Sequence, residues 1–229
     1  MRKFSRRRML LLIGSGAVGV VLVRALQQLV TRNMPVSIEK PIIVSRAEWG
    51  ARPPNHDAPN EFGFAANPIE SGWYVYPDDL AAAYSTVAIH HSAARLASNE
   101  TVQSIQNEHM DVNGWADIAY HFAIDNAGVI YQGREIGSRG ASVAGHNTGT
   151  IGVMVMGNFE LESPLDIQLT ALQSLVNWLA QQYTLTHLAG HGEFNPESVC
   201  PGKNMIVHLD TLAQWAGLLR GTGGYVELQ

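Results

Sequence analysis

Four short apolar runs limit the fold of this chain more than any other feature of its sequence. They are rich in β-branched or aromatic residues and are bounded by Gly, Asn or Asp: Val87–His90, Tyr120–Ile124, Val129–Tyr131 and Ile151–Met156. Runs of this kind are typical of short β-strands. Residues 125–128 (Asp-Asn-Ala-Gly) indicate a hairpin turn between two of them, because Asn and Gly tolerate left-handed backbone conformations. We therefore expect that pair to be antiparallel.

Helical patterns alternate with these runs. Ser163-Pro164 offers an N-cap followed by proline at the first helical position, and apolar residues then recur at helical spacing up to Ala180. A second helix is expected to start near Ser98 with Val102, Ile105 and His109 on one face, and a third to cover Ile206–Leu219. Residues 51–80 are rich in Pro, Asn, Gly and aromatic residues without a period, which predicts a long surface loop. The pattern as a whole is mixed α/β.

Composition favours one globular domain. The chain has 229 residues, of which 46% are hydrophobic and 15% charged, and this excludes a disordered or collagen-like protein. Residues 1–32 hold seven basic residues and no acidic one, so the remainder carries 8 basic against 20 acidic residues. An acidic body argues against nucleic-acid binding. The one cysteine, Cys200, excludes an internal disulfide.

The N-terminal segment predicts export. Residues 1–8 are basic, residues 9–23 form an uncharged apolar run, and Arg24 ends that run short of the roughly 20 residues that a spanning helix needs. Ser5–Leu10 resembles a twin-arginine signal, which implies export to the periplasm, cell wall or medium. The alternative is an uncleaved anchor, with membrane association only through residues 9–23. We expect residues 1–32 to be this signal or anchor, 33–45 a linker, 46–220 one domain and 221–229 a tail.

A histidine and the cysteine indicate a metal site. His191 and Cys200 lie nine residues apart on a proline-containing stretch that can fold both side chains onto one ion. A catalytic zinc takes three protein ligands and leaves one position to water, and His90, near the end of an apolar run, is the best-placed third donor. His91 points to the opposite face of the same strand. Two alternatives stay open: a His187/His191 pair on one helix, or Cys200 as a small buried hydrophobe.

The ordered motifs between about Ile43 and Leu219 resemble one known family. They are Arg46–Ala51, Ala88–Ala93, Ile105–Met110, Gly114–Phe122, Gly128–Arg134, Asn147 with Ile151–Val153, Gly157–Phe159, and Gly190-His191 with Cys200–Gly202. The chain is similar to the zinc-dependent N-acetylmuramoyl-L-alanine amidases of the phage-lysozyme and peptidoglycan-recognition-protein type. The resemblance implies a mixed β-sheet flanked by helices. It also implies Zn²⁺ held by His90, His191 and Cys200, and hydrolysis of the amide between the muramic acid lactyl group and L-alanine in peptidoglycan.

The resemblance assigns further roles. Tyr120 matches the family's catalytic tyrosine, whose phenol would donate to the oxyanion or position the water; without the family it reads as an ordinary strand tyrosine. Ser198 falls where relatives place lysine or threonine, and its hydroxyl would help at the oxyanion or else make a local turn bond. Four aromatic residues offer sugar-stacking surfaces, of which the first two are also expected in the core: Trp49, Trp115, Trp73 and Tyr76.

Several positions depart from the family pattern. Ser142 stands where relatives commonly carry histidine, and Met154 stands where some amidases place a glutamate. Proton transfer is left to Tyr120, Glu193, water or a neighbouring imidazole, with His146 as a possible replacement for the missing imidazole. The segment 52–85 is longer than in many relatives and would reshape the groove for the stem peptide.

Three functions follow from these residues. The first is a zinc amidase acting on peptidoglycan, which all three ligands and the tyrosine favour. The second is a peptidoglycan-binding or sensing module without catalysis. The third is hydrolysis of another acyl-amino-acid amide at the same site.

Overall fold

The computed structural model describes residues 38–77 and 79–225. The predicted signal or anchor over residues 1–32 lies outside these residues, as do residues 33–37 of the predicted linker. The elements in chain order are β1 Ile43–Val44, α2 Leu80–Ala83, β2 Thr86–His91, α3 Val102–Asp111, β3 Phe122–Ile124, β4 Ile130–Gln132, β5 Thr150–Val155, α4 Asp166–Gln182, β6 His187–Gly190, α5 His191–Phe194, α6 Lys203–Ala216 and β7 Leu219–Arg220. No helix in the described part of the chain combines the length and the apolar character needed to cross a membrane.

The strands form one mixed sheet in the order β1-β4-β3-β5-β2-β6-β7. Every neighbouring pair is parallel except β3 and β4, which are antiparallel as predicted. The hairpin between them turns at Gly128, whose φ is +76°, and the Asp125 carboxylate accepts from Ala127 N and Val129 N. The expected α/β fold is confirmed.

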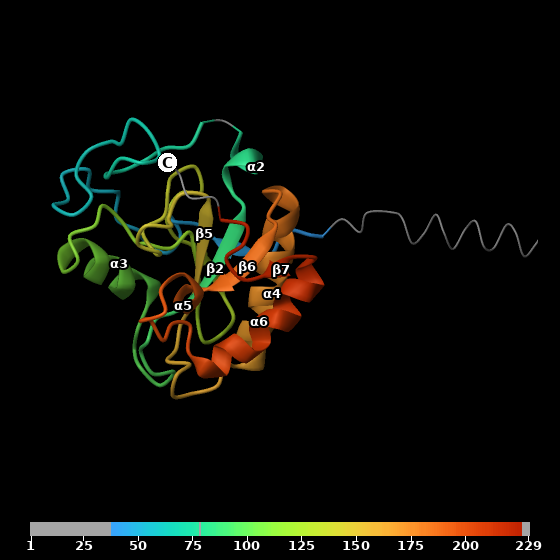
Figure 1. Cartoon of the computed structure of the whole chain (residues 1–229). Helices are drawn as coiled ribbons and strands as arrows, with labels where there is room; N and C mark the ends of the chain where they lie inside the picture. The colour runs from blue at the N-terminus through green and yellow to red at the C-terminus, as the bar shows by residue number, and fades with distance from the viewer. Residues whose placement is uncertain (1–37, 78, 226–229) are drawn as a thin grey trace, which may run out of the picture. The chain divides into compact units, whose positions relative to one another are not determined.

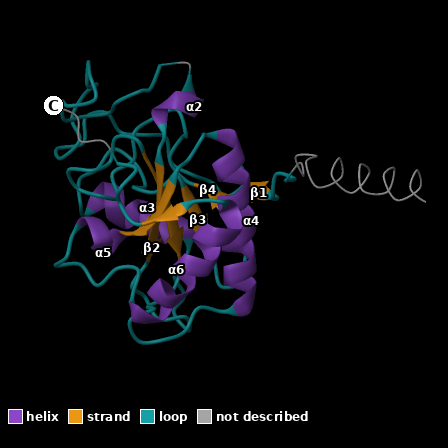
Figure 2. Ribbon diagram, turned by 45° about the vertical axis from the view of Figure 1, so that its right-hand side comes forward, coloured by secondary structure: helices purple, strands orange, loops and turns teal. Residues whose placement is uncertain are grey.

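Helices cover both faces of the sheet, with α3 on one side and α4 and α6 on the other (Figures 1 and 2). The larger core lies under α4 and α6, where Leu172, Leu175 and Leu179 are fully buried. A smaller cluster lies under α3 and includes Val102, Ile105 and Met154. Alternation along β2 and β5 explains the division, because successive side chains of a strand point to opposite faces.

The predicted boundaries of three helices are wrong. α4 begins at Asp166 rather than at Ser163-Pro164, because the Gln168 side chain accepts from Leu165 N at 3.1 Å and fixes the start there. α3 begins at Val102 rather than near Ser98, because Thr101 and Ser104 cap each other through both hydroxyls.

The third helix begins and ends earlier than predicted. α6 starts at Lys203 and stops at Ala216 because Gly217 adopts the left-handed conformation, with φ +71°. Leu219, the last residue of the predicted helix, belongs instead to the strand β7.

Two further differences concern the first strand of the sheet and the start of β3. Ile43 and Val44, within the expected linker, pair with β4 as β1. β3 begins at Phe122, so Tyr120 precedes the strand. Residues 51–77 of the predicted long loop are irregular, as expected, apart from isolated bridges such as Phe64 to Trp73.

Candidate metal centre

The carboxyl ends of two neighbouring parallel strands bring two histidines together. Ile89 of β2 is the register partner of Gly190 in β6, and His90 and His191 are the next residues on each chain segment. Their ring centroids lie 4.7 Å apart. Because the strands run in the same direction, side chains about 100 residues apart in the sequence meet at one edge of the sheet.

Cys200 joins this pair from the loop before α6. Its Sγ lies 3.7 Å from His90 Nδ1 and accepts from His91 N at 3.3 Å. Potential ligand atoms of His90, His191 and Cys200 all lie within 4.8 Å of one another. The three ligands predicted from the sequence therefore form one cluster.

A tight loop closure holds the thiol beside α5. Gly192 N donates to Cys200 O at 2.6 Å. A Cβ at position 192 would lie 2.5 Å from Ser198 O, closer than real Cβ atoms approach. Glycine is therefore required next to His191 for the chain to return to the cluster of His90, His191 and Cys200.

The chemistry of the cluster fits zinc. Burial lowers the pKa values of His90 and His191, so both imidazoles are neutral and able to ligate at pH 7. Burial raises the pKa of Cys200 to about 12, and a bound cation would favour its thiolate. Zinc–sulfur and zinc–nitrogen bonds of about 2.3 and 2.0 Å in a tetrahedral site place the two ligand atoms roughly 3.5 Å apart, close to the 3.7 Å observed for Cys200 and His90.

The other histidines near this edge have different partners. His91 Nδ1 accepts from Phe159 N at 3.2 Å on the opposite side of β2. His187 begins β6 and contacts Thr186 Oγ1 at 2.9 Å, so it does not share a helix with His191 and the alternative pair is wrong. His146 packs against Phe194 and Tyr225, outside the metal cluster.

Tyr120 lies beside the cluster. Its ring centroid is 5.0 Å from that of His90 and 5.5 Å from that of His109, and burial raises the pKa of its phenol. Gly133 backs this position, since a Cβ there would overlap Tyr120 O. The phenol of Tyr120 is thus protonated at neutral pH and lies next to the candidate metal centre.

Ser198 makes a local contact. Its Oγ accepts from Cys200 N at 3.3 Å, and its own N–H donates to Asn195 O. These bonds stabilise the turn that carries Cys200.

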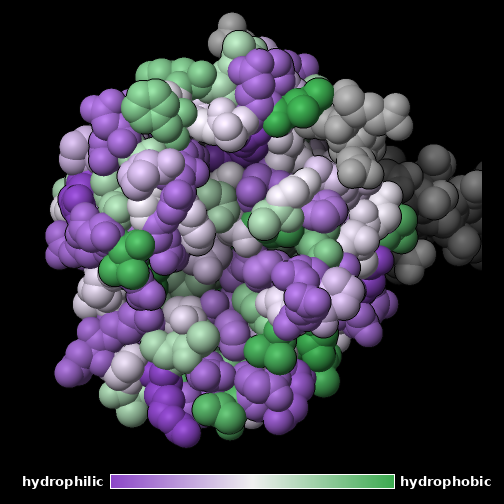
Figure 3. Space-filling model, turned by 60° about the vertical axis from the view of Figure 1, so that its left-hand side comes forward, coloured by the Kyte–Doolittle hydropathy of each residue, from purple (hydrophilic) through white to green (hydrophobic). Residues whose placement is uncertain are grey.

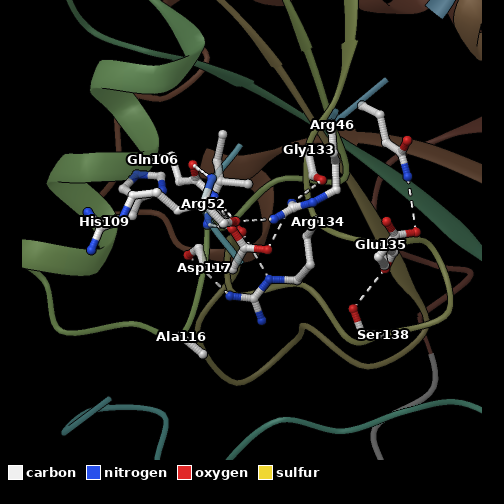
Figure 4. A network of polar contacts seen from close by, with 12 residues as sticks. Arg46, Arg52, Gln106, His109, Ala116, Asp117, Gly133, Arg134, Glu135 and Ser138 are labelled. Carbon is white, nitrogen blue, oxygen red and sulfur yellow. Dashed lines mark hydrogen bonds and ion pairs between the residues drawn. The ribbon is translucent and has the colours of Figure 1, made fainter. Parts of the chain in front are cut away.

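The segment before Tyr120 rests on a buried ion-pair network that sequence reasoning missed (Figure 4). The Arg134 side chain is fully buried and binds Glu61 through both terminal nitrogens, at 2.5 and 2.9 Å. Arg134 Nε also donates to Ile118 O at 2.9 Å, and Arg46 pairs with the buried Asp117 at 2.8 Å. Glu61 belongs to the long loop, so the same network anchors that loop beside the site.

His109 of α3 is a second residue that sequence reasoning did not place at the site. Its Nδ1 accepts from Ala119 N at 3.0 Å, and its ring lies between Trp115 and Tyr120, at 4.9 and 5.5 Å. Burial lowers the pKa of His109 to about 4. The neutral ring therefore supports the backbone immediately before Tyr120.

A cavity of about 460 Å³ opens next to this row of rings. One wall is the long loop, the other is the stretch after Arg139, and Trp115 and Tyr225 complete the lining.

Trp115 is thus a cavity residue rather than core, whereas Trp73 and Tyr76 are buried, with 5% and 8% of their surface exposed, and offer no stacking surface. The half-buried Trp49 packs against the α3-side core as expected. The face drawn in Figure 3 is mostly hydrophilic, and its hydrophobic residues lie in small separate groups.

Comparison with known proteins identifies the family. The sequence profile described as N-acetylmuramoyl-L-alanine amidase matches residues 81–203, which span all three candidate ligands and Tyr120. The chain belongs to this family.

Individual relatives cover most of the described chain. Peptidoglycan-recognition protein SC1a of Drosophila melanogaster is 31% identical over 183 residues, 76% of this chain and 88% of the relative. An endolysin of Klebsiella phage KP32 is 31% identical over 122 residues, 51% of this chain and 80% of the relative. The solved structure of the endolysin amidase LysCS from Clostridium intestinale URNW superposes with a TM-score of 0.58 at 24% identity, covering 80% of this chain and all of that one, and it supports the fold.

Proposed function

We propose that this protein is a zinc-dependent amidase that hydrolyses the bond between N-acetylmuramic acid and L-alanine in peptidoglycan. The observation that carries the proposal is the complete cluster of His90, His191 and Cys200 with Tyr120 beside it. Family membership and the names of the two relatives support the substrate class.

The side chains divide the work of the reaction. His90, His191 and Cys200 would hold the ion. When bound, zinc lowers the pKa of a water ligand and polarises the scissile carbonyl. Tyr120 donates a hydrogen bond to the carbonyl oxygen as negative charge develops there, and its raised pKa keeps the phenol protonated. Ser198 is a second, weaker candidate donor at the same oxygen.

The cavity supplies room for the peptide side of the substrate. The rings of Tyr120, His109 and Trp115 pack in sequence, and Trp115 lines the cavity. The polar lining includes Asn60, Asn147 and Thr148. We assign the stem peptide to this cavity, with the long loop as one wall.

We further propose that residues 1–32 direct export through the twin-arginine pathway, on the motif Ser5–Leu10. Fusion of this segment to a reporter tests the route. Changing both Arg6 and Arg7 to Lys should block export of the reporter, whereas unaffected export would assign the segment to the general secretory pathway.

Digestion of purified cell-wall sacculi tests the activity. Protein stripped of metal and protein loaded with zinc are incubated separately, and new L-alanine amino termini are quantified. The enzyme predicts release only with zinc. If sacculi bind the zinc-loaded protein and no L-alanine amino termini are released, the result would support a non-catalytic binding module. The similarity to a peptidoglycan-recognition protein is the reason to test for this alternative.

A further inference from the structure

The helix that carries His191 is too short to be stable by itself. α5 has four residues, His191–Phe194, and none of them is buried. Helices this short are unstable without tertiary support. Whatever fixes the imidazole of His191 must therefore come from outside α5.

Arg220 of β7 provides one such support. β7 pairs with β6 at the outer edge of the sheet (Figure 1). Arg220 Nη1 donates to Glu193 Oε2 at 2.6 Å and to Leu188 O at 2.9 Å. Glu193 Oε2 also accepts from Gly190 N at 2.6 Å. The guanidinium thus ties the end of β6 and the first turn of α5 together on both sides of His191.

These bonds also change the role expected for Glu193, which the sequence analysis names as a possible group for proton transfer. One of its oxygens already receives two hydrogen bonds, from Gly190 N and Arg220. The side chains of Glu193 and Arg220 are 31% and 22% exposed, so the pair is partly shielded from solvent. The position of this ion pair is suited to stabilising the turn between β6 and α5.

The residues after β7 supply a second support. Gly224 passes so close to the His187 ring that a Cβ there would overlap it. Tyr225 then reaches the far end of α5, where its ring centroid lies 6.0 Å from that of Phe194 and 4.8 Å from that of His146. Its hydroxyl donates to Gly145 O at 3.1 Å.

We propose that the C-terminal segment Leu219–Tyr225 positions His191 for metal binding, by bracing α5 through Arg220 at its start and Tyr225 at its end. The inference rests on the zinc site of the proposed function. It makes Glu193 and Arg220 positioning residues and gives part of the sequence's expected tail, residues 221–225, a role in the site.

Zinc affinity of the full-length protein tests the proposal, measured by competition with a chromogenic chelator. Arg220→Met and Glu193→Gln should each raise the zinc dissociation constant about tenfold or more, as loss of residues that support metal ligands typically does. Tyr225→Ala should raise it by a smaller factor. Asp210→Asn is the matched control, because Asp210 binds only the Nε side of Arg220, at 2.9 Å, and is 85% exposed; it should leave the constant within twofold of wild type.

A double-mutant cycle separates positioning from general damage. The zinc dissociation constant of the Glu193→Gln/Arg220→Met double variant should not exceed the larger of the two single-variant constants. Both changes remove the same contact, the one between Glu193 and Arg220. Additive losses, or single variants that all bind zinc within twofold of wild type, would overturn the proposal. If Arg220→Met does not fold, Glu193→Gln and Tyr225→Ala decide it. A wild-type protein that binds no zinc would refute the proposed function instead.

Discussion

The two faces of the sheet bury different kinds of side chains. Under α4 and α6 the large buried cluster is mostly aliphatic, with Leu172, Leu175 and Leu179 fully enclosed and a few aromatic rings among them. Under α3 the apolar cluster is small, and buried polar groups such as His90 and His109 accompany it. Aliphatic burial supplies stability without chemistry, whereas buried polar groups cost stability unless each finds a partner. The comparison indicates that one face stabilises the fold and the other carries the site.

The largest effect is expected from Cys200→Ser. Serine is a poor zinc ligand, so metal content should fall and release of L-alanine termini should drop below detection. The free energy of unfolding of the metal-free variant should lie within about 1 kcal/mol of that of metal-free wild type, since the change lies outside the main core. Metal analysis and urea denaturation check both halves. Unchanged zinc content would remove Cys200 from the site.

A substitution that creates a cavity in the core under α4 and α6 should lower stability without changing zinc binding. Leu175→Ala removes a fully buried side chain under α4 and should lower the free energy of unfolding by about 2–5 kcal/mol. The folded protein should still bind zinc with wild-type affinity. A large change in the zinc dissociation constant at temperatures where the variant is folded would show that the two faces are not separable.

Tyr120→Phe sharpens the assignment within the site. Loss of one donor to a developing oxyanion typically costs about 2.7–4 kcal/mol of transition-state stabilisation. Turnover should therefore fall by roughly 10²–10³-fold, while zinc content stays at the wild-type level. Steady-state kinetics with a soluble muropeptide measures the change. A wild-type rate would leave Tyr120 with a packing role only.

The smallest effect concerns pH. The pKa of His109 is lowered to about 4 by burial and is about 6.5 in the unfolded chain. The unfolded state therefore binds the proton first as pH falls, and the stabilisation present above pH 6.5 is lost between about 6.5 and 4. Between pH 7 and pH 5, metal-free wild type should lose about 2 kcal/mol more stability than His109→Asn. Equal losses in urea denaturation would show that His109 titrates normally.

Sequence patterns predicted the features that depend on local chemistry. The periodic runs located β2 to β5, and the Asp125–Gly128 turn located the hairpin. The His191–Cys200 interval and the position of His90 predicted one shared site, because a strand end and a following loop are places where ligands converge.

Other features depend on contacts that leave no local pattern. β1 and β7 have two residues each, too few to show a period. Glu61 and Arg134 pair across 73 residues, and the bond between Arg220 and Glu193 depends on β7 reaching β6. The predicted starts of α3 and α4 were wrong for a different reason. Side-chain bonds from Ser104 and Gln168 to residues three positions earlier fix these starts, and the spacing of apolar residues does not show them.

Mass spectrometry of a defined muropeptide after incubation with the zinc-loaded protein tests the central claim most directly. The account predicts two products, the sugar with a free lactyl carboxylate and the stem peptide with a free L-alanine amino terminus, and neither product from the Cys200→Ser variant. A muropeptide that is bound by the zinc-loaded protein and recovered intact would contradict it.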